Sequence, residues 1–178
     1  MRRLLVAFCL ACWAYPFQTF AQTVLKLGTE TAASGTAVDF PNIPPWVTRI
    51  TIMFDSVSTK GSSPMIVRIG DAGGIATSGY ASSATELDPT PTAVDDNASF
   101  ILEPGSSTAF SRSGSVVLTR MNTNNKWTSV GTLRTGSQSS TLHSAGVKTL
   151  GATLDRVRIT MSNGKDTFDA GNFNIIYE

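Results

Sequence analysis

Apolar and polar residues alternate along most of the chain after Thr36, in short runs bounded by Gly, Pro, Asn, Asp and Ser. An alternation with a period of two places successive side chains on opposite faces of a β-strand. The segment from Thr48 to Asp55, TRITIMFD, is typical, because Ile50, Ile52 and Phe54 share one face. It predicts a strand with one buried face and one solvated face.

The same pattern predicts six more strands, whereas no window of eleven or more residues after position 30 has the spacing of an amphipathic helix. These strands span Met65 to Asp71, Ala98 to Leu102, Ser115 to Met121, Lys126 to Leu133, Leu154 to Met161 and Asn172 to Tyr177. Short strands at this spacing predict an all-β fold, an antiparallel β-sandwich of the jelly-roll type, as a single domain over residues 22–178.

Turn residues mark the connections between these strands. The stretch from Met121 to Lys126, rich in Asn, predicts one hairpin, and Asn163-Gly164 predicts a second hairpin between the last two strands. The polar segment from Ser82 to Asn97 contains two prolines and two adjacent aspartates. It is interpreted as a long surface loop, which is a common location for binding residues.

The N-terminus has the features of a secretory signal peptide over residues 1–21. Two arginines precede an apolar run from Leu4 to Phe17, and Thr19-Phe20-Ala21 resembles the site for cleavage after Ala21. A membrane anchor is the alternative, but the run is shorter than the roughly 20 residues that cross a bilayer as a helix. A lipidated Cys12 is a third alternative.

Composition narrows the functional classes. Both cysteines, Cys9 and Cys12, lie in the predicted signal peptide, so the mature chain would contain no disulfide. Its 12 basic and 13 acidic residues would give a formal charge of −1, without a basic patch for nucleic acid or for stable membrane insertion after cleavage. We expect a secreted or virion-associated protein that binds no nucleic acid.

Catalytic and metal motifs are scarce. The single histidine, His143, lies in a polar stretch, and the sequence has no nucleophile elbow. Zinc needs several His or Cys ligands, and neither Asp95-Asp96-Asn97 nor Asp166 with Asp169 has the spacing of a calcium-binding EF-hand loop. We therefore expect no cofactor, no metal site and no enzymatic activity. A small exported hydrolase that uses a pair of carboxylates is the alternative.

Three long segments resemble a known family. They are Leu27 to Phe54 (LGTETAASGTAVDFPNIPPWVTRITIMF), Val67 to Tyr80 (VRIGDAGGIATSGY) and Leu154 to Glu178 (LDRVRITMSNGKDTFDAGNFNIIYE). Together they resemble the C-terminal, receptor-binding tip domain of bacteriophage tail fibres and related phage structural proteins. The resemblance implies an all-β homotrimer that contacts a receptor on the bacterial surface. The signal-like segment at the start departs from the fibre pattern and leaves open a free exported protein, a prophage remnant or a virion protein.

Aromatic side chains and loop polar groups are the candidate binding residues, because stacking and fixed hydrogen bonds hold sugars in shallow sites. Trp46 follows two prolines and is expected to close one end of the sandwich. Trp127 follows the predicted Asn-rich turn, which would hold it near the surface, and Tyr80 would lie at the base of the long loop. The predicted ligand-binding residues are Tyr80, Asp95, Asp96, Asn97 and Trp127.

The sequence therefore predicts a non-enzymatic binding module for a bacterial surface glycan or outer-membrane receptor. The alternative is a structural protein of a virion or secreted particle, whose exposed surfaces would serve subunit assembly. A receptor-binding site and a subunit interface would both be found as an exposed apolar patch on the protein surface.

Overall fold

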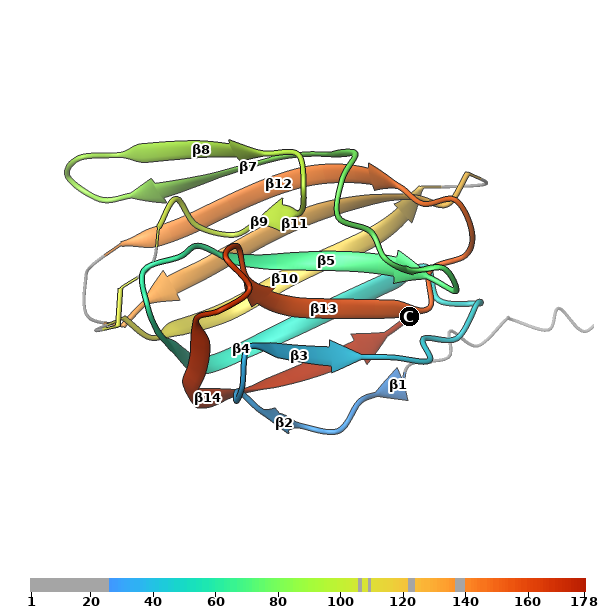
Figure 1. Ribbon diagram of the computed structural model, residues 1–178, viewed down its shortest axis with the longest axis horizontal. Helices are drawn as coiled ribbons and strands as arrows, with labels where there is room; N and C mark the ends of the chain where they lie inside the picture. The colour runs from blue at the N-terminus through green and yellow to red at the C-terminus, as the bar shows by residue number, and fades with distance from the viewer. Residues whose placement is uncertain (1–25, 106, 109, 122–123, 137–139) are drawn as a thin grey trace, which may run out of the picture.

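Two antiparallel sheets pack face to face in the computed structural model, which describes residues 26–105, 107–108, 110–121, 124–136 and 140–178 (Figure 1). In these residues the large sheet has nine strands. Eight of them run in the order β1 (Lys26–Leu27), β14 (Thr167–Tyr177), β4 (Arg49–Lys60), β10 (Arg112–Met121), β11 (Lys126–Thr135), β12 (Thr141–Thr149), β7 (Tyr80–Leu87) and β8 (Thr92–Asp96), and β2 (Thr31–Ala32) also pairs with β14.

The small sheet lies over the large one and has five strands among the described residues. Its order is β3 (Ala37–Phe40), β13 (Arg156–Met161), β5 (Met65–Asp71) and β6 (Gly74–Ile75), and β9 (Phe100–Ile101) also pairs with β5. The predicted all-β sandwich is confirmed, while the strand order does not confirm the jelly-roll connectivity.

The core lies between the sheets, as the alternation predicts. On β4, the side chains of Ile50 and Ile52 are fully buried, while Arg49 and Thr51, which alternate with them, face outward. On the facing sheet, Val67 of β5 and Val157 of β13 are also fully buried. Burial of this kind, at about 25 cal/mol per Å² of apolar surface, is the main favourable term in folding.

The interpretation of residues 82–97 as a long loop is wrong, because this segment forms most of the β7–β8 hairpin (Figure 1). The two strands pair from Ser82 with Asp96 to Glu86 with Thr92. Only the tip between them, which contains Pro89 and Pro91, is irregular. The small and acidic residues of this hairpin are poor strand formers, so tertiary pairing with β12 overrides their local preference.

The prediction that Asn163-Gly164 joins two paired strands as a hairpin is also wrong. Gly164 has a φ of 61° and donates its N–H to the Met161 carbonyl, so the tight turn is present. However, β13 belongs to the small sheet and β14 to the large one. The turn therefore passes the chain from one layer to the other.

The described residues contain no helix that is long and apolar enough to span a membrane. The predicted signal peptide, with its cleavage after Ala21, lies outside the described residues. It stays a prediction.

Candidate functional site

A groove of about 870 Å³ lies on the large sheet where β12, β7 and β8 run side by side. Four of the five predicted binding residues line it, namely Tyr80, Asp95, Asp96 and Asn97. The sequence separates Tyr80 from the other three by a complete hairpin. The pairing of β7 with β8 brings them together, with the Tyr80 N–H donating to the Asn97 carbonyl at 3.0 Å.

Small side chains form the floor of this groove. Strand register places Ala145, Ser83 and Asp95 in one row across β12, β7 and β8. All three are exposed, because they lie on the outer face of the sheet, away from the core. Ala81 and Val147 pair in the neighbouring row. Since Ala and Ser side chains rise little above the backbone, the surface is hollow here.

Two polar side chains of the groove, Ser82 and Asp96, are already hydrogen-bonded within the protein. Ser82 is buried, and its Oγ donates to the Ser99 carbonyl at 2.7 Å and accepts the Ile101 N–H at 3.1 Å. Asp96 accepts the Ala98 N–H at 3.0 Å and also the Ser99 hydroxyl. Both groups therefore hold the chain after β8 in place and have little capacity left for a ligand.

Three polar side chains remain open to solvent at the groove. Ser83, Asp95 and Asn97 are exposed and have no side-chain hydrogen bond recorded within the described part of the chain. A serine hydroxyl and an asparagine amide can each donate and accept, whereas an ionised aspartate only accepts. Together they can bind a ligand that carries several hydroxyl groups.

Tyr80 is among the residues that line the groove, but its ring lies in the core. Its hydroxyl accepts the Ile69 N–H at 3.0 Å and lies within hydrogen-bonding distance of the Ile69 and Ala76 carbonyls. The ring packs edge-on against Phe100 at 5.0 Å. Burial, opposed by the Ile69 hydrogen bond, raises the pKa of Tyr80 to about 12. Tyr80 therefore positions the groove and does not offer a stacking face, contrary to the prediction.

The predicted surface position of Trp127 is wrong. Its side chain is 1% exposed and lies in the core. The turn ends just before β11, and the alternation along that strand sends Trp127, Ser129 and Leu133 to the inner face. Trp127 is also absent from the groove lining.

Trp46 differs from its prediction in the opposite direction to Trp127, because it is exposed where it was expected to be buried. It was expected to close the end of the sandwich, but it is 42% exposed. The turn that carries it is held by the Val47 N–H on the Pro44 carbonyl and by an Arg120 Nη1–H on the Pro45 carbonyl. Neighbouring Val47 fills the core position instead, at 2% exposed.

The positions of two neighbouring carboxylate pairs follow from the strands that carry them. Asp95 and Asp96 are adjacent in β8 and therefore face opposite sides of the sheet. Glu103 interacts electrostatically with Glu86, but its side chain is only 1% exposed. Its carboxylate binds Arg112 Nε at 2.9 Å and accepts the Met65 N–H at 3.0 Å. Burial raises the pKa of Glu103, and Arg112 opposes that shift. This pair ties the segment after β9 to β5 and β10.

The other candidates from the sequence have structural roles. Asp166 accepts hydrogen bonds from the Asn163 amide and the Ser63 N–H, and these bonds lower its pKa. Asp169 accepts the Ser58 hydroxyl. His143 lies within β12, exposed, with Nδ1 at 3.4 Å from the Thr132 hydroxyl. Within the described residues, no three His, Cys, Asp or Glu side chains converge as a metal site would require.

No family model, curated protein or solved structure matches the chain significantly. The groove must therefore be interpreted from its own geometry.

Proposed function

We propose that this protein is a non-enzymatic binding module that recognises a bacterial surface glycan or a glycan-bearing outer-membrane receptor through the groove on β12, β7 and β8. One observation carries the proposal: the open side chains of Ser83, Asp95 and Asn97 surround a floor of small residues in a groove of about 870 Å³. Concave sites with a few placed polar groups are the usual form of a small-ligand site.

A single groove of this kind is expected to bind its ligand with low affinity. Its polar groups are exposed to water, and no aromatic ring among the described lining residues stacks on a ligand, since Tyr80 faces inward. Hydrogen bonds that replace bonds to water contribute only about 0.5–1.5 kcal/mol each. Useful affinity would therefore come from several copies binding one surface, which suits the proposed homotrimer.

The resemblance of the sequence to phage tail-fibre tips supports the same proposal independently of the groove. A tip domain in a virion, or a free exported relative of one, would meet glycans at the bacterial surface. Phage morphogenesis genes beside the coding sequence would favour the virion role, and a mature N-terminus at Gln22 in mass spectrometry would support export.

The groove is tested by binding to whole bacteria and to a printed array of bacterial surface glycans. We expect Asn97→Ala and Asp95→Ala each to weaken binding by about two- to tenfold, because each removes an open polar group from the groove. Glu30→Ala is the matched control, because Glu30 is exposed near the opposite edge of the same sheet, between β1 and β2. Unchanged binding in both groove variants would contradict the proposal.

The non-enzymatic character needs its own experiment. Incubation of the protein with host surface polysaccharide, followed by size analysis of the polysaccharide, should leave the chain length unchanged. Shortened chains would identify a hydrolase instead.

A role in assembly is the second candidate, and a specific surface favours it. Strand register places Leu27, Ile176, Thr51, Val117 and Val130 in one uncharged row across the outer face of the large sheet. Leu27 and Val130 are each 61% exposed. The other three residues are half-buried, so the row as a whole is accessible, and apolar surface on an exposed sheet face often marks a subunit contact.

Light scattering separates this second role from the first. If the row mediates assembly, Val130→Lys should reduce the oligomer size, while Thr132→Lys, two residues along the same face of β11, should not. An unchanged oligomer in Val130→Lys would exclude this surface as the contact.

A further inference from the structure

We infer that the groove selects glycans that are neutral or carry amino groups, and that it discriminates against glycans bearing carboxylate, phosphate or sulfate. This inference rests on the proposed function of the groove. It names the chemical class of the ligand and makes Asp95 the residue that determines specificity.

The first argument is the sign of charge in the groove. The lining residues in the described chain are Tyr80, Ala81, Ser82, Ser83, Asp95, Asp96, Asn97, Ala145, Gly146 and Val147. They include no lysine or arginine, and the exposed carboxylate among them is that of Asp95, since the Asp96 carboxylate is engaged by the Ala98 N–H and the Ser99 hydroxyl. An anionic ligand would therefore meet like charge, and like charges at a few ångströms repel appreciably even close to water.

The second argument is the hydrogen-bonding capacity of Asp95. Its side chain is exposed, and no hydrogen bond or ion pair is recorded for it in the described residues. An ionised carboxylate offers acceptor positions only, so its partner must be a donor. Sugar hydroxyls and protonated amines are donors, whereas carboxylate, phosphate and sulfate oxygens at neutral pH are acceptors.

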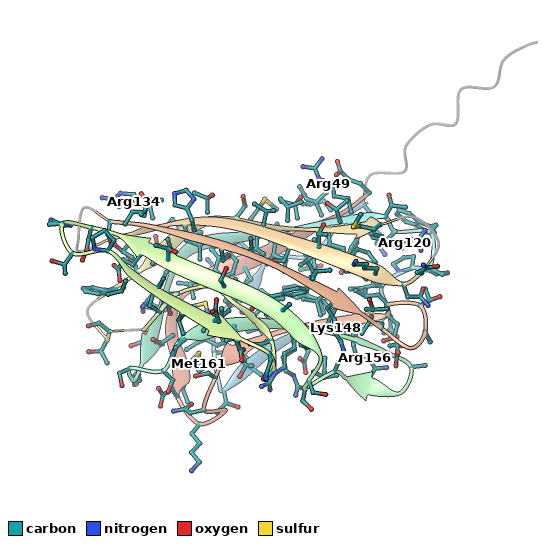
Figure 2. All side chains as sticks on the ribbon, turned by 90° about the horizontal axis from the view of Figure 1, so that it is seen from above. Arg49, Arg120, Arg134, Lys148, Arg156 and Met161 are labelled. Atoms are coloured by element: carbon teal, nitrogen blue, oxygen red, sulfur yellow. The ribbon has the colours of Figure 1, made fainter. Side chains whose placement is uncertain are left out.

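The third argument is the position of the nearest cations. Lys148 Nζ donates to the Ser78 carbonyl at 2.7 Å and lies 5.1 Å from the Tyr80 ring centroid. Arg68 Nε donates to the Ala98 carbonyl at 3.1 Å and belongs to the small sheet. Arg134 and Arg120 lie toward opposite ends of the molecule (Figure 2). None of these side chains lines the groove.

The fourth argument is the size of the open surface. Neighbouring strands lie about 4.8 Å apart, so β12, β7 and β8 give a platform about 10 Å wide, and two rows along a strand add about 7 Å. Ser83 and Asp95 occupy one row, and Asn97, which follows the end of β8, is exposed and also lines the groove. These polar groups can hold one or two sugar rings through their hydroxyl groups.

The experiment uses the mature protein on a printed array of bacterial surface glycans that contains pairs differing only by a carboxylate or phosphate. The neutral or amino member of each pair should bind about tenfold more tightly than the acidic member, and added salt should leave the binding of the neutral member unchanged. Asp95→Asn should narrow the difference, and Asp95→Lys should reverse it. Glu30→Gln, which removes an equal charge on the other side of the sheet, should leave it unchanged.

The outcomes distinguish the two proposals. If no glycan binds, the proposed function fails and the inference fails with it. If acidic members bind the wild-type protein as tightly as their neutral partners, or if Asp95→Lys leaves the preference unchanged, the inference is overturned while glycan binding stands.

Discussion

The two halves of the large sheet are built from different side chains on their inner faces. In the half formed by β14, β4 and β10, the inner face carries large apolar residues such as Ile52, Phe54 and Phe173. In the half formed by β11, β12 and β7, large inner residues such as Trp127 and Leu142 alternate with six small ones, which are Ser82, Ala84, Ser129, Gly131, Ser144 and Gly146. The first half supplies apolar burial, and the second supports the groove.

Small residues in the second half allow β9 to approach the sheet. A Cβ atom added to Gly146 would lie 2.8 Å from Phe100 Cδ1 and 2.6 Å from Ser82 Cβ. Phe100 therefore covers β12 only because position 146 has no side chain. Ser82 is hydrogen-bonded to the Ser99 carbonyl and the Ile101 N–H. These bonds help to hold β9 against the sheet, whereas in the first half large apolar side chains hold the layers together.

The sharpest test of the apolar half is Phe173→Ala. Phe173 is fully buried, and its ring meets Phe54 and Phe168 edge-on at 5.0 and 5.3 Å. Truncation should lower the free energy of unfolding by about 3–5 kcal/mol, because it removes transfer energy and leaves a cavity. Urea denaturation measures this loss.

Phe173→Leu is the matched control for that substitution. It keeps most of the apolar volume and should cost less than half as much. If Phe173→Ala costs no more than about 1 kcal/mol, the apolar half does not carry the stability that its burial indicates.

Tyr80 gives the second test, because it lies in the polar half and its pKa is raised to about 12. Between pH 10 and 12 the unfolded chain releases the phenol proton while the folded chain retains it, so rising pH favours unfolding. Stability should be unaffected by this group below pH 10. It should then fall by about 3 kcal/mol up to pH 12, at about 1.4 kcal/mol per pKa unit.

Urea denaturation across this pH range should therefore give a shallower decline for Tyr80→Phe than for the wild type. The variant retains the contribution of Tyr177, whose pKa burial also raises. Equal slopes in the two proteins would show that the Tyr80 hydroxyl is not held as its contacts indicate.

The same contrast explains which elements could be predicted from the sequence. The strand at Met65 to Asp71 was predicted with the bounds that the structure has, because large apolar residues alternate along it. β7, β8 and β12 were missed, because Ser, Ala, Gly and Asp on both faces give no apolar period. Their strand structure depends on pairing with partners distant in the chain, which local pattern does not encode.

The candidate site was predicted in part for the same reason. Asp95 and Asn97 were selected as polar residues of a supposed loop, and the hairpin places them beside Ser83 at the groove. The roles of Tyr80 and Trp127 were wrong, because a preference for aromatic binding residues ignored the strand alternation that turns both inward. Ser83 lies between buried Ser82 and buried Ala84 and therefore points outward, but this alternation could be used only once β7 was recognised as a strand.

The smallest effect, and the most direct test of the polar half, is expected from Ser82→Ala. This change removes the acceptor for the Ile101 N–H at 3.1 Å and the donor to the Ser99 carbonyl at 2.7 Å. A buried N–H left without a partner costs about 1–3 kcal/mol, so urea denaturation should show a loss of about 1–2 kcal/mol. Ser83→Ala, next in sequence but on the exposed face, should change stability by less than about 0.5 kcal/mol. Equal effects of the two substitutions would mean that packing by Phe100 alone holds β9 against the sheet, and the two halves would then be stabilised in the same way.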